Sequence, residues 1–375
     1  MTATDDAPAA LAPIAERAAA PATLPAITAG GLSWRAATRD DAPVVCDLLN
    51  AVLAADRATY RMTPQEVAES FDSPMRDDAT DTLLGLDGDG VPRAFGSIVA
   101  PPGDTTLVRT YLEGGVHPER RGEGIGRELL AWQVARARQV LAASGKDAPA
   151  RIAGFADDHA PESRHRLFAR AGFREARFYH DLRRDLTGPD ATPVPEVSLD
   201  APLRLVPWSA DLDEATRLAH NDAFRDHWGS QPQSREQWAH GRSEFAPQWS
   251  FLVVDDAPDV EALLADPHTD AETAAALRAG EPLVVGYEIA GRYDEDFPVQ
   301  GYTFGYTEIL GVRRAYRGRR VAVAALAAGM RAFAADGMRY ACLDVDTANP
   351  SGAHGLYASL GYEKTTGSRL YAIDL

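Results

Sequence analysis

Val116-His117-Pro118-Glu119-Arg120-Arg121-Gly122-Glu123-Gly124-Ile125-Gly126 is the most informative segment of the sequence. It follows a strand-like run at residues 107–116 and leads into a long helix with the apolar stripe Gly126, Leu130, Val134, Ala137 and Leu141. The glycines remove side chains that would keep a ligand away from the backbone. The free N–H groups of the first helical turn then converge where the helix dipole favours negative charge. The stretch therefore predicts a cradle for a pyrophosphate group.

Two familiar glycine-rich loops fit this stretch poorly. A P-loop is excluded, because no Lys-Ser or Lys-Thr pair follows the glycines. A Rossmann fingerprint is disfavoured, because the spacing is Gly-x-Gly-x-Gly and several strands precede it. The bland alternative is a glycine-rich turn that only connects a strand to a helix.

The same order of elements occurs twice along the chain. Val116 and Val312, Arg121 and Arg317, and Gly126 and Ala322 all pair at an offset of 196 residues. In the first half, strands are expected at residues 32–37, 82–86, 94–99, 107–116, 151–156 and 176–186, with helices at 38–53, from 63, from 126 and at 162–171. In the second half, strands are expected at 203–206, 249–254, 283–290, 302–312, 340–345 and 367–373, with helices at 211–224, from 322 to about 336, and at 351–359. A repeat this long predicts two copies of one domain and not a solenoid.

The length agrees with this division, since 375 residues exceed what a single hydrophobic core organises. Residues 1–31 are rich in Ala and Pro and predict a mobile tail, with a short helix at 9–20 as the alternative. The N-terminal domain is expected at 32–187 and the C-terminal domain at 202–375. Residues 188–201 between them predict a linker stiffened by proline.

Composition bounds the class of protein. Apolar residues make up 45% and charged residues 25%, as in soluble globular proteins. No apolar run approaches the roughly 20 residues of a membrane span, and the acidic N-terminus does not resemble a secretory signal. Cys46 and Cys342 are too few for a disulfide framework, and no cluster has the spacing of metal ligands, so we expect a cytoplasmic protein without a metal. The net charge of −17 disfavours nucleic acid as a partner, and an anionic ligand needs a local basic patch.

The order of strand, Arg121-x-x-Gly124-x-Gly126, long helix, strand and short helix resembles the GCN5-related N-acetyltransferase (GNAT) family. Residues 32–375 resemble a tandem GNAT protein, an arrangement that includes mycothiol synthase. The resemblance implies an α/β (α+β) fold of two tandem domains, each a mixed, mostly antiparallel twisted sheet flanked by helices. It implies that acetyl-CoA binds at the loops, with its pantetheine arm between the fourth and fifth strands. The residues it assigns to this binding are Val116, Arg121, Gly122, Gly124, Ile125 and Gly126 in the first half, and Leu310, Val312, Arg317, Gly318, Arg319, Arg320, Ala322 and Asn349 in the second.

The second loop departs from the family pattern, because Arg320 stands where a glycine is usual. The contact there is largely through backbone N–H groups, so an outward side chain is compatible with binding. Five arginines lie at residues 313–320, and guanidinium groups suit the phosphates of CoA. The alternative is a solvated or nucleic-acid-binding basic patch.

Acetyl transfer to an amine needs a base for the amine, a polarised thioester carbonyl and a proton for the leaving thiolate. By the resemblance, Tyr357 matches the general acid of the family. Glu308 precedes the loop and is the candidate base, and a backbone N–H near Val312 would polarise the carbonyl. The first half has Phe168 in place of the tyrosine, although its Glu113 is also a candidate base. A packing role for Tyr357 and a surface role for Glu308 are the bland alternatives.

We therefore expect an N-acetyltransferase that moves an acetyl group from acetyl-CoA to a primary amine of a small molecule, with chemistry in the C-terminal half. The alternative class is a non-catalytic acyl-CoA-binding or interaction protein, which Phe168 and Arg320 favour. A narrower alternative is an enzyme like mycothiol synthase. Residues 223–229 resemble a segment in the region that lines the acceptor site of tandem GNAT proteins, and His227 within it is a candidate substrate contact, with a structural histidine as the alternative. Carboxylates at 255–296 would attract a cationic amine or simply keep a loop soluble. Two joined copies satisfy the pairing of single-domain relatives, so a monomer is expected.

Overall fold

The computed structural model describes residues 11–189, 191–225, 230–348 and 353–375. The chain forms two compact units. Unit 1 comprises the residues up to Arg57, together with Phe71–Ala176 and Arg369–Leu375, and unit 2 comprises Ala58–Ser70 and Arg177–Ser368. Each unit is described by itself. Among the described residues, no helix is both long and apolar enough to cross a bilayer.

Unit 1 is built on a mostly antiparallel sheet. Its strands are β1 (Ser33–Arg35), β2 (Thr82–Leu86), β3 (Pro92–Val99), β4 (Val108–Val116) and β5 (Ala150–Asp157), adjacent in that order, with the end of β12 (Glu363–Asp374) beside β5. Only β4 and β5 among the paired strands β1–β5 run parallel. Its helices are α1 (Ile14–Arg17), α2 (Ala42–Ala55), α4 (Asp78–Asp81), α5 (Ile125–Ala143) and α6 (Glu162–Arg170).

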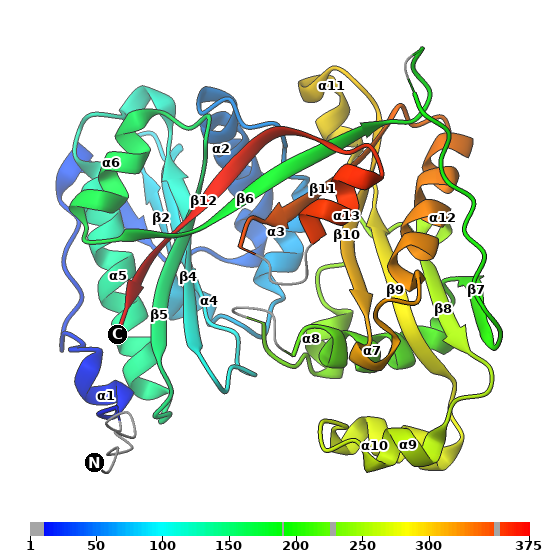
Figure 1. Cartoon of the computed structure of the whole chain (residues 1–375). Coiled ribbons are helices and arrows are strands. Elements are labelled where there is room, and N and C mark those ends of the chain that lie inside the picture. Colours follow the sequence, from blue (N-terminus) through cyan, green and yellow to red (C-terminus); the bar gives the residue numbers. More distant parts are fainter. Residues whose placement is uncertain (1–10, 190, 226–229, 349–352) are drawn as a thin grey trace, which may run out of the picture. The chain divides into compact units, whose positions relative to one another are not determined.

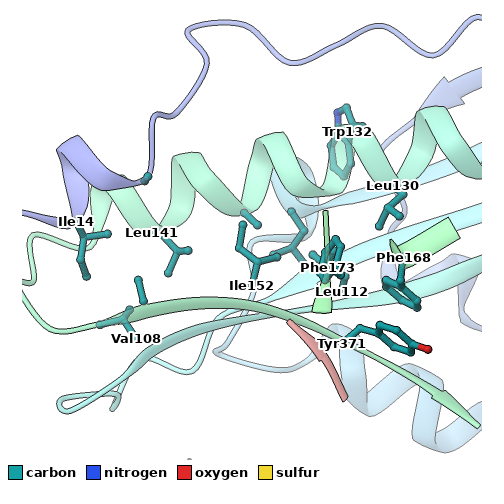
Figure 2. Packing of buried hydrophobic residues seen from close by; sticks show 14 of the residues in the cluster. Ile14, Val108, Leu112, Leu130, Trp132, Leu141, Ile152, Phe168, Phe173 and Tyr371 are labelled. Atoms are coloured by element: carbon teal, nitrogen blue, oxygen red, sulfur yellow. The ribbon is translucent and has the colours of Figure 1, made fainter. Parts of the chain in front are cut away.

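Helices cover both faces of this sheet. A Cβ on Gly96 would meet Leu129 of α5, whereas a Cβ on Gly115 would meet Val52 of α2. Gly96 of β3 lies directly opposite Gly114 of β4, the neighbour of Gly115. Because neighbouring residues of a strand point to opposite faces, α5 and α2 pack on opposite sides of the sheet. Figure 2 shows the core on the α5 side, where Leu130 and Leu141 of the helix face the strands.

Residues 11–32 pack on unit 1, which differs from the mobile tail expected at residues 1–31. Helix α1 is one turn, much shorter than the alternative helix at 9–20. Ile14 is fully buried beside Leu141 in the core (Figure 2). Further along, Arg138 and Gln139 of α5 donate to the carbonyl groups of Ala18 and Pro21. The low apolar periodicity misled the prediction, because the segment is held by a few buried side chains and by its backbone carbonyls.

Unit 2 repeats the architecture. Its strands are adjacent in the order β6 (Arg174–Asp185), β11 (Tyr340–Asp346), β10 (Phe304–Val312), β9 (Leu283–Gly291), β8 (Phe251–Asp255) and β7 (Leu203–Pro207). Only β10 and β11 run parallel among these pairs. The helices are α3 (Pro64–Phe71), whose last residue belongs to unit 1, α7 (Asp213–Ala223), α8 (Arg235–Ala239), α9 (Val260–Ala265), α10 (Ala271–Ala279), α11 (Phe297–Gln300), α12 (Val321–Ala335) and α13 (Ala353–Ser359).

Helix α12 covers one face of this sheet and α7 the other. A Cβ on Gly305 would meet Phe333 of α12, and one on Gly286 would meet Val321. Tyr287, which follows Gly286 in β9, points to the opposite face. Its hydroxyl forms a hydrogen bond with Nδ1 of His220 in α7, at 2.7 Å. In Figure 1, α12 lies along β9 and β10. The expected mixed, mostly antiparallel sheet with flanking helices is confirmed in both units.

Candidate functional site

The candidate site lies where β10 and β11 separate. Their recorded pairs are Phe304 with Tyr340, Gly305 with Ala341, and Tyr306 with Cys342. Both strands continue beyond that point, to Val312 and Asp346. No further pair between them is formed among the described residues, so backbone groups of β10 on this side are available to a ligand.

Glu308 occupies a β-bulge just beyond the last of these pairs. On the other side of β10, Thr307 pairs with Ala290 and Ile309 with Ile289, which leaves Glu308 as the extra residue. Thr307 faces α12 and bonds Glu288, whereas Ile309 packs in the apolar cluster that contains Ala219 of α7. Because bulges redirect side chains, the extra residue presents Glu308 at the point where the strands part.

Glu308 combines exposure with dense surroundings. Its side chain is accessible to solvent, and the Tyr293 hydroxyl donates a hydrogen bond to its Oε1. Loss of hydration raises the pKa of Glu308 to about 7, the negative charges of Asp344, Glu66 and Glu244 raise it further, and the bond from Tyr293 opposes the rise. A carboxylate with this pKa suits a general base at neutral pH.

Asp344 lies across the opening, two residues beyond the last paired residue of β11. Its Oδ1 accepts a hydrogen bond from the Tyr306 hydroxyl at 3.0 Å. Desolvation raises the pKa of Asp344 above its usual range, and this bond opposes the rise. Tyr306 also packs edge-on against Tyr293, with ring centroids 5.7 Å apart. The two tyrosines therefore hold the two carboxylates beside the opening.

Tyr357 approaches from α13. It is 8% exposed, and its ring lies 5.8 Å from that of Tyr362. Among the described residues its hydroxyl forms no hydrogen bond. Burial raises the pKa of Tyr357 above its usual value, with smaller contributions from Asp344 and Glu288. Tyr357 is thus a protonated hydroxyl at neutral pH, with electrostatic coupling to the same Asp344 that acts on Glu308.

The loop that precedes α12 has the backbone conformation of the first loop. Gly318 and Arg320 have φ values of +78° and +63°, where Gly122 and Gly124 have +86° and +88°. Arg320 and Gly124 are the N-caps of α12 and α5. Arg320 therefore adopts the left-handed conformation that the glycine pattern requires, at a cost of roughly 1–2 kcal/mol for a non-glycine residue. Leu310 and Val312 lie on β10 before the loop, and Ala322 lies in the first turn of α12.

The basic side chains of the two loops differ in their partners. In the first loop, Arg121 pairs with the buried Asp56 at 2.7 Å, and Arg120 pairs with Glu123 at 2.8 Å. In the second, three exposed arginines have no carboxylate partner among the described residues: Arg317 donates to the Ala223 carbonyl at 2.8 Å, Arg319 lies over the Tyr316 ring, and Arg320 is exposed to solvent. The second loop thus offers uncompensated positive charge to a phosphate ligand.

Arg313 differs from the exposed arginines of the second loop. Arg313 is buried, its Nε donates to the Val284 carbonyl at 2.8 Å, and burial lowers its pKa. Arg313 therefore holds the end of β10 against β9 and does not face solvent.

The first half lacks two features of the site in unit 2. Strand β4 pairs with β3 without a register shift, and Glu113 lies directly opposite Ser97. Phe168 occupies the position of Tyr357 and stacks on Tyr371, with ring centroids 4.9 Å apart (Figure 2). The other loop residues are placed as expected for a strand-to-helix turn: Val116 ends β4, Ile125 is buried as the first residue of α5, and Gly126 follows it.

This chain is similar to known proteins in both sequence and structure. Residues 222–362 match the acetyltransferase (GNAT) family. The resemblance to the GNAT family is confirmed. A mycothiol acetyltransferase of Thermobispora bispora is 29% identical over 301 residues, which cover 77% of this chain and 87% of that protein. These sequence comparisons support an acyltransferase.

Solved structures share the GNAT fold over nearly the whole chain. A GCN5-related N-acetyltransferase from Sphaerobacter thermophilus has a TM-score of 0.62 at 22% identity, covering 94% of this chain and 97% of that one. A tandem GNAT protein from the clavulanic acid biosynthesis pathway has a TM-score of 0.60 at 16% identity, covering 92% and 98%. The expected tandem GNAT architecture is therefore confirmed.

Some residues that meet at the candidate site of unit 2 were not predicted from the sequence. Asp344 was missed, although an acid inside the apolar run Ala341-Cys342-Leu343-Asp344-Val345 is a visible signal. Tyr293 and Tyr306 gave no comparable signal, because aromatic residues are common in strands. Two predicted residues, Asn349 and His227, lie outside the residues that the structure describes.

Proposed function

We propose that this protein is an acetyl-CoA-dependent N-acetyltransferase that acetylates a primary amine of a small molecule, with the chemistry in unit 2. The observation that carries the proposal is the bulged Glu308 at the opening between β10 and β11. Tyr357 and the second loop add the other parts that the reaction needs.

The second loop fits the phosphates of acetyl-CoA. Its left-handed residues Gly318 and Arg320 bring the N–H groups of the first turn of α12 to the surface. Arg317, Arg319 and Arg320 supply positive charge that no carboxylate neutralises among the described residues. The pantetheine arm would continue along β10 past Val312 and Leu310, where a backbone N–H would polarise the thioester carbonyl.

Two side chains would move protons in the reaction. Glu308, with a pKa of about 7, would take a proton from the ammonium form of the acceptor. The neutral amine would then attack the thioester carbonyl, and collapse of the tetrahedral intermediate would form the amide and release the thiolate. Tyr357 would give its proton to that thiolate. Asn349 and His227 remain proposals from the family resemblance alone, the former near CoA and the latter near the acceptor.

The surroundings of Glu308 favour a cationic acceptor. Glu66, Glu244 and Asp344 all act on Glu308 with negative charge. Asp296 lies among the same carboxylates, and burial raises its pKa to about 7. An amine is a cation at neutral pH, so this negative potential would draw it to the site.

The test offers acetyl-CoA to the purified protein with a set of amines and detects the acetylated products by mass spectrometry. The set contains a polyamine, lysine, an aminoglycoside and the cysteinyl-glucosaminyl-inositol substrate of the mycothiol reaction. Cadaverine and its amino-alcohol analogue form a matched pair that differs in one charge. We expect a single acetyl group on the preferred amine and a higher kcat/KM for cadaverine than for the analogue. Release of free CoA without any acetylated amine would contradict the proposal.

The sequence relative favours one named acceptor as a second candidate. The similarity to a mycothiol acetyltransferase covers most of both chains. Acetylation of the cysteinyl-glucosaminyl-inositol compound in preference to every other amine in the set would support an enzyme like that relative. Failure to acetylate it would remove this candidate and leave the general proposal standing.

A further inference from the structure

Two buried oxygen atoms of unit 2 have no hydrogen-bond partner among the described residues. One is Oε2 of Glu288 on β9, which is fully buried and whose Oε1 accepts a hydrogen bond from the Thr307 hydroxyl at 2.9 Å. The other is the hydroxyl of Tyr362, a residue that is 5% exposed and whose ring lies 5.8 Å from that of Tyr357. Because buried polar groups are nearly always hydrogen-bonded to protein or ordered water, this group needs an explanation.

The fold makes room for the carboxyl group of Glu288. A Cβ on Gly329 of α12 would lie 2.6–2.8 Å from its carboxyl atoms, so a larger residue there would displace the carboxyl group. Burial raises the pKa of Glu288 well above its usual value, and the bond from Thr307 opposes the rise. A buried carboxyl group without a charged partner favours its protonated form, which has an O–H to donate.

These groups are coupled to Tyr357. The charge that Glu288 carries when ionised raises the pKa of both Tyr357 and Tyr362, and the rings of Tyr357 and Tyr362 lie 5.8 Å apart. The other groups that act on the two tyrosines are Asp344 on Tyr357, and Cys342 and Arg184 on Tyr362. Thr307 and Gly329 complete the surroundings of Glu288.

Tyr357 needs help to act as an acid. A phenol of pKa about 10 gives its proton to a thiolate of pKa about 8.5 with an equilibrium constant unfavourable by about 30-fold. Burial makes Tyr357 a weaker acid still. A hydrogen bond donated to the tyrosinate oxygen opposes this cost, because hydrogen bonds to charged groups are about twice as strong as neutral ones.

We propose that Glu288 is a positioning residue for the acid: its protonated carboxyl donates a hydrogen bond to the Tyr362 hydroxyl, which donates to an ordered water that in turn donates to the Tyr357 oxygen as Tyr357 gives up its proton. The Tyr357 O–H bond breaks and an S–H bond forms on the leaving CoA thiolate. Glu288 keeps its own proton throughout. The proton that Glu308 takes from the amine passes to solvent, and Tyr357 recovers one from solvent. The inference rests on the proposed function.

The test is a double-mutant cycle on the full-length protein, with kcat measured at saturating acetyl-CoA and the preferred amine. Glu288→Leu removes the donor, and we expect it to lower kcat by about 10- to 100-fold. Glu288→Gln keeps an N–H donor of similar shape and should retain kcat within about threefold of the wild-type value. In a Tyr357→Phe background, Glu288→Leu should cause no further loss.

A purely structural role gives a different pattern. Glu288→Leu would then lower kcat by the same factor with or without Tyr357, and that additive result would overturn the inference. Tyr362→Phe provides a second, nearly isosteric variant if Glu288→Leu does not fold. It should lower kcat about three- to tenfold when Tyr357 is present and leave it unchanged in the Tyr357→Phe background. Wild-type kcat in both Glu288→Leu and Tyr362→Phe would also overturn the inference, whereas wild-type kcat in Tyr357→Phe alone would refute the assignment of the acid in the proposed function.

Discussion

Glu308 shows how one extra residue in a strand changes a side chain's chemistry. The bulge between Thr307 and Ile309 leaves Glu308 outside the regular pairing and beside the opening of β10 and β11. It stays in contact with solvent, which a base that returns its proton requires. The nearby protein groups nevertheless raise its pKa to about 7.

The raised pKa of Glu308 predicts the pH dependence of the reaction. A base acts when deprotonated, so kcat/KM should increase as pH rises through about 7 and level off above it. Glu308→Gln should lower kcat/KM by about 100- to 10,000-fold and remove this inflection. Glu113→Gln, a glutamate on β4 of unit 1, is the control and should keep the wild-type profile. An unchanged inflection in Glu308→Gln would show that another group is the base.

Arg320 is a residue whose local conformation conflicts with its type. Its φ of +63° is the conformation that Gly124 adopts in the first loop. Arg320→Gly should therefore raise the free energy of unfolding by about 1 kcal/mol, as measured by urea denaturation. Arg319→Gly is the matched control, because Arg319 is exposed but does not have a positive φ, and it should not stabilise the protein. Equal stabilities of the two variants would contradict the strain argument.

At the scale of elements, α12 approaches the sheet closely at Gly329, where a side chain would collide with a residue of β9. Gly329 is the point where the helix passes over the Glu288 carboxyl. The sequence predicted the helix from its apolar stripe, but an isolated glycine inside that stripe gave no sign of what it faces. Such a contact depends on which residues two distant elements bring together, which periodicity does not reveal.

Substitution of this glycine tests the close packing. Gly329→Ala should lower the free energy of unfolding by about 1–3 kcal/mol, because its Cβ would overlap a buried carboxyl group. Gly355→Ala in α13 is the control, since a Cβ there meets nothing within 4 Å. It should be neutral or stabilising by up to about 1 kcal/mol, as alanine favours the helix. A Gly329→Ala protein as stable as Gly355→Ala would show that α12 can shift without cost.

The segment before β1 is the element that the sequence predicted least well. Its alanines and prolines resemble a disordered tail, yet α1 packs in the core of unit 1. Ile14→Ala should lower the free energy of unfolding by about 2–5 kcal/mol, because a buried side chain is truncated. Leu11, which is 51% exposed, provides the control, and Leu11→Ala should change stability by less than about 0.5 kcal/mol. Comparable effects of the two variants would contradict the packing of this segment.

At the scale of the whole molecule, the duplication was readable from the sequence because strong local signals recur in the same order. The glycine loops, the long helices and the strand that precedes each loop all have the expected periodicity. The sequence did not reveal which strand segments belong to which unit. Residues 179–185 of β6 pair with β11 in unit 2, and the last residues of β12 lie beside β5 in unit 1. Pairing of this kind is a long-range choice that no local pattern encodes.

The two copies differ in the groups that the reaction needs. Unit 2 has the bulged Glu308, Tyr357 and loop arginines without a carboxylate partner among the described residues, whereas unit 1 has Phe168 and loop arginines that are paired with carboxylates. The sequence identified the exchange of tyrosine for phenylalanine. The bulge and the ion pairs became visible only in the structure, because they depend on register and on partners such as Asp56 that lie far away in the sequence.

The most direct test of this account measures kcat and the acetyl-CoA dissociation constant of Tyr357→Phe. The matched control is Tyr371→Phe, which removes a tyrosine hydroxyl beside Phe168 in unit 1. The account predicts that Tyr357→Phe lowers kcat by at least about 100-fold with an unchanged dissociation constant, and that Tyr371→Phe retains kcat. Wild-type turnover by Tyr357→Phe, or its loss in Tyr371→Phe alone, would contradict the assignment of the chemistry to unit 2.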